Sequence, residues 1–333
     1  MSPQIIALQD RRLTAVVLSM TPLWYTAGAD RATDRPAQVR AGSSLAWFGP
    51  RLAVVQDDAC FVALVDPWRG QVDALALPAG EGGLRQFDDR RGNKRFKPDF
   101  EACAVLPWAG VEAFLAFGSG SSGQRESVAV VEASGQARIY QAGGLYAHLR
   151  AAKTFSGSEL NVEGAVFADG LLRLFNRGNG AVRDGLPPCD ASGELSAAEL
   201  EAYLRDPGQC PVPELRGIVQ YDLGRVAGSR LTFTDAMATT DGGFLYIAAA
   251  EDSIDVLTDG RVAGSAVGVV DQAQGCRWIE LREADGGLFA AKVEGVCAVP
   301  GRKDRLYMVI DEDDPARPSQ LCEIALAGPW FYA

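Results

Sequence analysis

Three short segments of the sequence place a glutamate directly before small residues and a hydrophobic run. They read Phe-Glu-Ala-Cys-Ala around Glu101, Val-Glu-Gly-Ala-Val around Glu163 and Val-Glu-Gly-Val-Cys around Glu294. Two weaker copies, headed by Ser44 and Asp235, fit the same frame. The copies recur at intervals of about 60 to 70 residues, and a repeat of such long period sets the architecture of the whole chain.

Carboxylates brought together by a repeat repel one another, so they must protonate, spread apart or hold a cation. The only histidine, His148, lies outside the repeat, so every candidate ligand atom is an oxygen. Oxygen ligands favour a hard cation over zinc, and five of them with added water suit Ca²⁺ better than Mg²⁺. The sequence therefore predicts one Ca²⁺ ion held by Ser44, Glu101, Glu163, Asp235 and Glu294. The alternative is that each acid only caps backbone N–H groups where neighbouring sheets meet.

The residues that follow each polar position read as four short strands with tight turns, which is the pattern of one propeller blade. In the first repeat the predicted strands are 44–48, 51–56, 61–65 and 71–77, and in the second 102–106, 112–117, 127–132 and 136–140. The first strand of each blade lines the central channel of a propeller. We therefore expect an all-β, five-bladed β-propeller whose repeated polar residues surround the axis.

The remaining elements of the 333-residue chain fit a single propeller domain. Apolar runs at 4–8 and 12–19 are expected to complete the last blade, which leaves no open sheet edge. A sixth blade built from residues 4–40 is the alternative.

A long insertion is expected at 177–215, within the third blade. Ser196 followed by Glu199 is a capping box for a short helix, whose apolar side would carry Leu200, Tyr203 and Leu204. Because the insertion follows a second strand, we expect it to cover the face that carries Glu163, as a lid or a docking surface.

A basic run separates the first two repeats: residues 85–97 contain six Arg and Lys residues among thirteen. Converging arginines suit phosphate or carboxylate groups, which they bind in a bidentate manner. The predicted anion-binding residues are Arg91, Lys94, Arg95, Arg177 and Asn179. A solvated loop is the alternative. No Gly-x-Ser-x-Gly motif occurs, so no serine triad is predicted and no catalytic residue is assigned.

The composition limits the partners and the location. The net charge of −11 disfavours nucleic-acid binding, which needs a basic face. No segment of 18 apolar residues or signal-peptide pattern is found, so we expect a cytoplasmic protein without a membrane span. The seven cysteines are expected to be reduced, and a Cys189–Cys210 pair is left open.

The polar positions, one per blade, resemble those of the calcium-activated nucleotidase (apyrase) propellers. The Glu-Gly strand starts are similar to those of phytase-like esterase propellers and related bacterial proteins of unknown function. The resemblance implies five blades and an axial calcium ion held by Ser44, Glu101, Glu163 and Glu294. Asp235, preceded by Thr234, departs from the pattern. A full nucleotide-binding set has no counterpart here, so apyrase activity is not implied.

Two functions are compatible with these patterns. The first is a calcium-binding propeller that recognises a small anionic ligand, or a protein partner, through the loops of its channel face. The second is a metal-assisted phosphohydrolase that combines the axial ion with the basic run. Access to the ion distinguishes them, because a catalytic ion keeps a position open for water.

Overall fold

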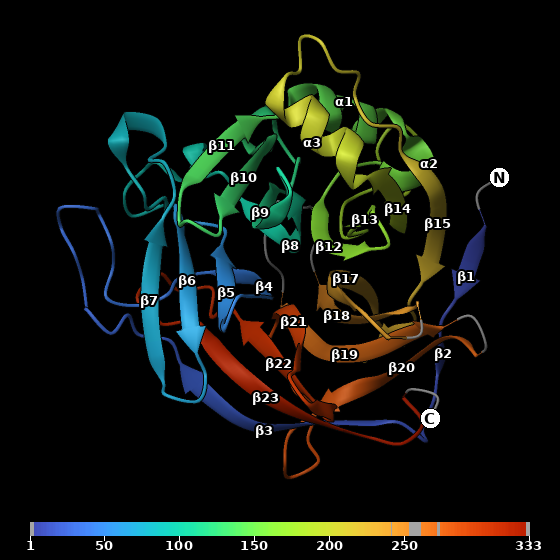
Figure 1. Ribbon diagram of the computed structural model, residues 1–333. Coiled ribbons are helices and arrows are strands. Elements are labelled where there is room, and N and C mark those ends of the chain that lie inside the picture. Colours follow the sequence, from blue (N-terminus) through green and yellow to red (C-terminus); the bar gives the residue numbers. More distant parts are fainter. Residues whose placement is uncertain (1–2, 241, 253–260, 272–273, 331–333) are drawn as a thin grey trace.

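The computed structural model of the protein describes residues 3–240, 242–252, 261–271 and 274–330. These residues form antiparallel sheets arranged in a ring, with few and short helices at its edge (Figure 1). This is a β-propeller fold, in which each sheet runs from an inner strand at the axis to an outer strand at the rim.

Within the described ranges, five sheets can be followed from the inner strand outwards. The first comprises β4 (Gly42–Phe48), β5 (Arg51–Gln56), β6 (Phe61–Asp66) and β7 (Gln71–Ala76). The second comprises β8 (Phe100–Trp108), β9 (Val111–Gly118), β10 (Ser127–Glu132) and β11 (Ala137–Gln141). The third comprises β12 (Val162–Ala168), β13 (Leu171–Asn176), β14 (Asp190–Ser196) and β15 (Arg216–Asp222). The fourth comprises β17 (Ser229–Ala238), β18 (Phe244–Asp252), β19 (Arg261–Asp271) and β20 (Gly275–Arg282).

The fifth sheet is completed by the N-terminal part of the chain, as predicted. After β21 (Val293–Val299), β22 (Arg302–Ile310) and β23 (Gln320–Ala327), the outer strand is β3 (Thr14–Pro22). Its pairing with β23 is antiparallel and closes the ring without a terminal sheet edge at this point. Two shorter N-terminal strands extend other sheets: β1 (Gln4–Ile6) pairs with β15 and β2 (Leu8–Gln9) pairs with β20.

The inner strands hold the ring together. Each contacts the inner strands of the preceding and following sheets, in the order β4, β8, β12, β17, β21 and back to β4. Buried apolar side chains fill the spaces between neighbouring sheets; Phe175, Phe233 and Phe244, for example, pack edge to face between the third and fourth. This ring of five agrees with the predicted blade number rather than with a sixth blade.

The predicted insertion is only partly an insertion. Residues 190–196 form β14, the third strand of its sheet, and the helix α3 (Ala197–Arg205) follows that strand. The Ser196 N-cap of the predicted capping box is confirmed, since the Ser196 hydroxyl accepts a hydrogen bond from the Glu199 N–H at 3.3 Å. Leu200, Tyr203 and Leu204 are buried as expected.

The predicted position of α3 as a lid over Glu163 is wrong. The end of β14 lies beside the start of β13, at the end of β12 far from Glu163. Glu201 of α3 accepts a hydrogen bond from the Ala109 N–H, in the turn that follows β8. The extra strand β14 reverses the chain once more, so the helix emerges at the opposite end of the sheet.

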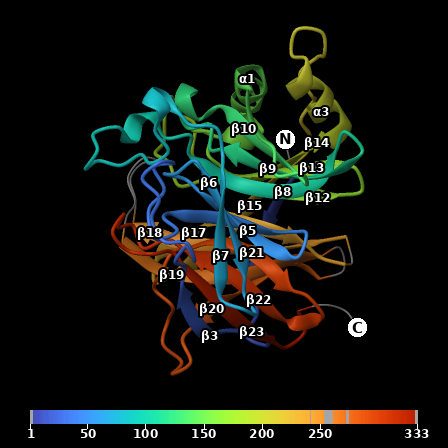
Figure 2. The same ribbon diagram turned by 60° about the vertical axis from the view of Figure 1, so that its left-hand side comes forward.

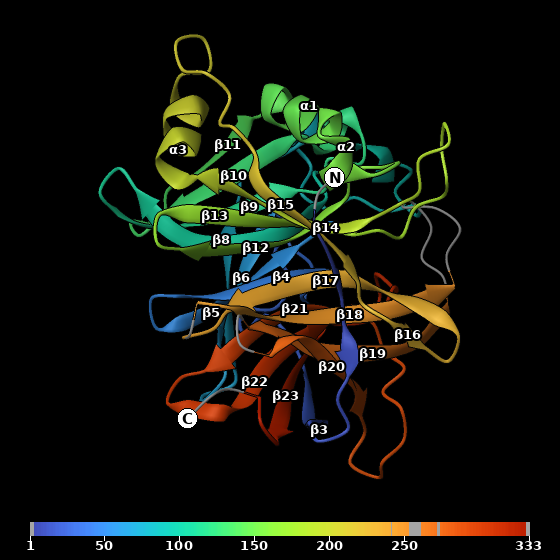
Figure 3. The same cartoon turned by 90° about the vertical axis from the view of Figure 1, so that its right-hand side faces the viewer.

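Two other helices pack beside α3. α1 (Gly143–Ala151) and α2 (Lys153–Ser156) link the second and third sheets, and α1 shares an apolar cluster with α3. In two further views α1 and α3 lie at the edge of the molecule, away from β3, β22 and β23 (Figure 2; Figure 3). The helices therefore fill the outer space between two sheets and do not cover the channel.

All seven cysteines lie in the described part of the chain and none is in a disulfide, Cys189 and Cys210 included. Among the described helices, none has both the length and the apolar composition needed to cross a bilayer.

Candidate axial ion site

A β-bulge occurs at the same place in each of the five described inner strands. In β8 the pairing with β9 skips Glu101, in β12 it skips Glu163 and in β21 it skips Glu294. In β4 and β17 the skipped residues are Ser43 and Thr234. A bulge re-aims the side chain of the extra residue, which here turns the repeated polar group towards the axis.

The repeat frame predicted from the sequence is therefore shifted by one residue in two blades. Ser44 and Asp235 occupy the position after the bulge, where the other blades carry Ala102, Gly164 and Gly295. A Cβ atom on Gly295 would lie 2.8 Å from the Cα of Ser44, so the inner strands converge too closely for larger residues. This explains the small residues that follow each glutamate.

Ser44 and Asp235 close the channel beneath the glutamates instead of joining them. The Ser44 hydroxyl donates to Asp235 Oδ2 at 3.1 Å, and the Val296 N–H donates to the same oxygen at 3.0 Å. Burial raises the pKa of Asp235 well above its usual range. Neither residue lines the cavity described next.

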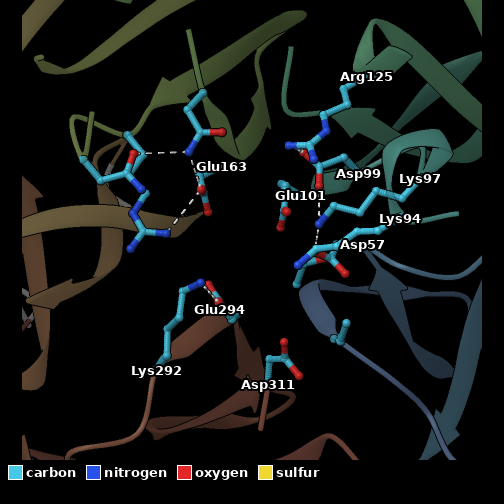
Figure 4. A pocket seen from close by; sticks show the side chains of 16 residues that line it. Asp57, Lys94, Lys97, Asp99, Glu101, Arg125, Glu163, Lys292, Glu294 and Asp311 are labelled. Atoms are coloured by element: carbon cyan, nitrogen blue, oxygen red, sulfur yellow. Dashed lines mark hydrogen bonds and ion pairs between the residues drawn. The ribbon is translucent and has the colours of Figure 1, made fainter. Parts of the chain in front are cut away.

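Above this layer lies a cavity of about 60 Å³, the axial cavity, whose lining is almost entirely polar (Figure 4). Its side chains come from the bulged residues, from the residues two positions before them, from the loops after the second strands, and from the basic run. Its carboxylates are Asp57, Asp99, Glu101, Glu163, Glu294 and Asp311, and its cations are Lys94, Lys97, Arg125, Arg177 and Lys292.

On one side of the axial cavity the charges are closely paired. Arg177 lies 3.3 Å from Glu163 Oε1 and 2.9 Å from Glu251 Oε1, and is almost fully buried. Lys292 lies 2.7 Å from Glu294 Oε1, and Asn161 donates to Glu163. Burial opposes the charge on Arg177, but Glu251 and Glu163 raise its pKa well above the usual value.

On the opposite side Asp99 is the centre of the pairing. Lys97 Nζ lies 2.5 Å from Asp99 Oδ1 and 2.5 Å from Asp57 Oδ2, and Arg125 lies 2.8 Å from Asp99 Oδ2. Burial alone would raise the pKa of Asp99, but Lys97 and Arg125 hold it below the usual value. Asp57, Asp99 and Glu101 each present one oxygen within 4.8 Å of the others, a geometry compatible with a metal ion.

Two carboxylates in the axial cavity have no cationic partner among the described residues. Glu101 and Asp311 make no hydrogen bond or ion pair there, and Glu294 Oε2 is buried without a hydrogen-bond partner. Burial, and then the charges of Asp57 and Asp99, raise the pKa of Glu101 well above its usual range. Burial and Asp57 do the same to the pKa of Asp311, and burial raises that of Glu294.

A second, larger cavity of about 290 Å³, the side cavity, adjoins the axial cavity. The two share Asp57, Lys94, Lys97 and Asp311. The side cavity is lined by loops after β5 and β22 and by the basic run, including Asp58, Asp88, Asp89, Arg90 and Asp313. The axial cavity is therefore not sealed by its own carboxylates.

The predicted anion-binding residues are only partly brought together. Lys94, Arg177 and Asn179 line the axial cavity. Arg91 instead pairs with Asp34 at 3.0 Å, and Arg95 lies over the ring of Phe96, with 4.6 Å from Cζ to the ring centroid. Neither lines either cavity, because Asp34 holds Arg91 and the ring of Phe96 holds Arg95 at the surface.

Sequence reasoning missed the residues two positions before the bulge. Asp99, Asn161 and Lys292 stand at this position and face the cavity, because alternate residues of a strand share a face. The signal was present as Asp-Phe-Glu, Asn-Val-Glu and Lys-Val-Glu, but the residue type differs in each blade. Asp57 and Asp311 lie in polar loops at the ends of second strands, where a repeat comparison could have found them.

Comparison with solved structures finds many propeller-like chains of low similarity. A gluconolactonase from Xanthomonas campestris is 12% identical, with 94% of this chain and 97% of that chain covered and a TM-score of 0.41. A β-1,3-galactosidase of glycoside hydrolase family 43 is 11% identical, with 92% of this chain and 59% of that chain covered and a TM-score of 0.49. At these values nothing about the activity is transferred.

No curated protein matches the sequence. The resemblance to calcium-activated nucleotidases stays a prediction. A family profile, by contrast, matches residues 38–326, which include all five inner strands and the whole axial cavity. The chain therefore belongs to the family of unknown function DUF6929.

Proposed function

We propose that the protein binds one divalent cation, Ca²⁺ in preference to Mg²⁺, in the axial cavity. The observation that carries the proposal is the set of unpaired oxygens: the carboxylates of Glu101 and Asp311, and Glu294 Oε2. Unpaired carboxylates in a buried cavity must either bind protons or face a cation. Oxygen-only donors from two inner strands and a loop fit the irregular coordination of Ca²⁺ better than the strict octahedron of Mg²⁺.

The charge balance of the cavity supports a doubly charged ion. Five cations line the cavity against six carboxylates, and Glu251, which pairs with Arg177 and Lys292, adds a seventh carboxylate. With all groups ionised, five positive and seven negative charges leave a formal charge of −2. One divalent cation would neutralise this charge, whereas a monovalent ion would leave part of it.

A small anionic ligand, such as a phosphate or a carboxylate, would bind beside the ion. Lys94 is the best candidate to hold it, because it lines both cavities and its only close partner among the described residues is the exposed Asp89, at 3.3 Å. Arg177, Lys97 and Arg125 are engaged with buried carboxylates, so they are less free to turn towards a ligand. The ligand would reach the ion through the side cavity.

Calorimetric titration with CaCl₂ at pH 7.5 tests the proposal. We expect one site per chain, weakened at least tenfold by Glu101→Gln or Asp311→Asn. Asp169→Asn is the matched control, because Asp169 is an exposed acid in the turn after β12 and asparagine tolerates its positive φ of 49°. Absence of Ca²⁺ binding to the wild type, or equal affinities for all four proteins, would overturn the proposal.

Inorganic phosphate tests the anionic ligand. With Ca²⁺ present and at low salt, phosphate should raise the melting temperature of the wild type. Lys94→Ala should remove this effect, and Arg95→Ala should keep it, because Arg95 lies outside both cavities. Equal protection of the two variants contradicts the assignment of Lys94.

Metal-assisted hydrolysis of a phosphoester is the second candidate. It is favoured by the side cavity, which leaves room for a water molecule or a substrate beside the ion. Ca²⁺-dependent release of p-nitrophenol from p-nitrophenyl phosphate, abolished by Glu101→Gln, is the result expected. If the wild type and Glu101→Gln show the same rate, the ion has no catalytic role with this substrate.

A further inference from the structure

The Asp57–Asp99–Glu101 triad has the geometry of a cation site, and a cation already lies in it. The Lys97 ammonium is 2.5 Å from Asp57 Oδ2 and 2.5 Å from Asp99 Oδ1, and Lys97 is only 8% exposed. It therefore occupies the position between two carboxylates that a metal ion would take. The ammonium is supplied by the chain itself, from the residue that follows a 3₁₀ turn at Lys94–Phe96.

Lys97 satisfies the triad incompletely. It carries one positive charge and contacts two of the three carboxylates, so Glu101 is left without a direct partner. Arg125 contacts Asp99 but neither of the other two acids. A divalent ion that contacted Glu101 and Asp57 would carry more charge to the triad than the ammonium, and would repel the ammonium at short range.

The side cavity offers a second position for the Lys97 ammonium, near Asp58. Its side chain lines the side cavity as well as the axial cavity. Asp58, which lines the side cavity, binds Arg40 through Oδ2, whereas its Oδ1 is buried without a hydrogen-bond partner. The lysine stem is flexible, and Lys97 and Asp58 line the same cavity, so we expect the ammonium to be able to turn from Asp57 towards the neighbouring Asp58.

The groups around this second position are a mixture of charges. Arg40 contacts both Asp58 and Asp88, at 3.0 Å for Asp88, and Arg91 lies 3.9 Å from Asp88. Asp311 also lines the side cavity. The lining of the side cavity has more carboxylates than cations, so it can accept a further positive charge.

We propose that Lys97 is an internal cation that holds the Asp57–Asp99–Glu101 triad in the metal-free protein, and that an entering divalent ion displaces its ammonium towards Asp58. The inference rests on the proposed function, because it concerns the same ion. It assigns Lys97 as the residue that sets the affinity for the ion, since binding must first remove a competing charge.

Calorimetric titration with CaCl₂ compares the wild type with Lys97→Met and Lys97→Arg. Lys97→Met should bind at least tenfold more tightly, because the competitor is gone. Lys97→Arg should bind at least tenfold more weakly, because a guanidinium holds carboxylates in a bidentate manner. Arg95→Met is the matched control for charge removal in the same segment, and should change the affinity less than threefold.

A measurement on the wild type does not depend on the folding of any variant. In ¹H–¹⁵N spectra of lysine side chains, a buried, hydrogen-bonded ammonium gives a slowly exchanging signal, which Lys97→Met assigns by its loss. Added Ca²⁺ should shift this signal in proportion to occupancy. A Lys97 signal unchanged at saturating Ca²⁺ would overturn the displacement.

The outcomes separate this inference from the proposed function. Tight binding by Lys97→Met alone supports Lys97 as the internal cation of the triad, but it overturns both the displacement and the proposed function of the natural chain. Binding by the wild type that Glu101→Gln weakens and Lys97→Met leaves unchanged overturns the displacement alone. If neither the wild type nor Lys97→Met binds Ca²⁺, both the displacement and the proposed function are refuted.

Discussion

Replacing Arg177 by methionine is expected to be one of the most destabilising single changes near the axis. The side chain of Arg177 is 2% exposed and lies between Glu163 and Glu251, whose side chains are 6% and 3% exposed. At an effective dielectric constant of about 20, each such contact is worth roughly 4 kcal/mol before desolvation is counted. Methionine keeps much of the volume and removes the charge.

The net effect should be a loss of about 3–5 kcal/mol in the free energy of unfolding, the usual result when one partner of a buried ion pair is removed. Two buried carboxylates are then left without their shared partner. For domains of 150–250 residues each kcal/mol shifts the melting temperature by about 2–4 °C, and by less in longer chains, so we expect a decrease on the order of 10 °C. Urea denaturation and calorimetry at pH 7.5 measure both quantities.

Arg51→Met is the matched control, because Arg51 pairs with Asp73 at the surface and both are substantially exposed. Its loss should stay below about 1 kcal/mol. The double variant Arg177→Met/Glu163→Gln should recover part of the loss, since one of the two orphaned charges is removed. If Arg177→Met costs no more than Arg51→Met, or if the double variant is less stable than the single one, the electrostatic reasoning is refuted.

Two further results are expected. Glu101, Glu294 and Asp311 have raised pKa values in the folded state, as do Asp190 at about 6 and Asp58 at about 7. The metal-free folded state thus binds more protons than the unfolded chain, so its stability should fall from pH 5 to pH 8, by up to about 1.4 kcal/mol per pH unit for each such group. Saturating Ca²⁺ should flatten the profile, and a flat profile without metal contradicts the prediction. Because burial raises the pKa of Asp235 well above its usual range, Asp235→Asn should change the free energy of unfolding by less than about 1 kcal/mol, whereas Asp235→Ala should cost about 1–3 kcal/mol by leaving the Val296 N–H unpaired. A larger loss in Asp235→Asn than in Asp235→Ala would mean that the carboxylate is ionised.

The repeated part of the fold could be predicted, because the inner strands of several blades begin with the same sequence pattern. A glutamate at the bulge, small residues where the inner strands converge and a run of apolar residues are enough to locate β8, β12 and β21. The completion of the fifth sheet by β3 could also be predicted, because the last blade would otherwise have an open edge.

The predicted alignment of the repeat was wrong by one residue in the two blades where two polar residues are adjacent in the sequence. In the first and fourth blades Ser43-Ser44 and Thr234-Asp235 occupy both the bulge and the next position. The sequence pattern cannot tell which of two adjacent polar residues a bulge selects, and the more acidic one was chosen in the fourth blade. The structure assigns the bulge to Thr234, which leaves Asp235 as a buried hydrogen-bonding group beneath the cavity.

The position of α3 failed for a different reason. Successive antiparallel strands of a blade end on opposite faces of the propeller. If one strand is not recognised, every later segment of that blade is therefore assigned to the wrong face. Residues 190–196 contain Gly193, two serines and two acidic residues, and this polar composition conceals β14. Gly193 is required there, because a Cβ atom would lie 2.7 Å from a methyl group of Leu215.

The partners of the axial glutamates lay beyond sequence reasoning, because pairing is decided by side-chain reach across blades. Arg177 of the third blade neutralises Glu251 of the fourth, and Lys97 of the basic run neutralises Asp57 of the first. A per-blade repeat predicts identical charges around the axis, yet the fold surrounds most of them with cations from other loops. Among the described residues, Glu101 and Asp311 have no such cation, and the proposed ion site is therefore located by the carboxylates that stay unpaired and not by the repeated acids alone.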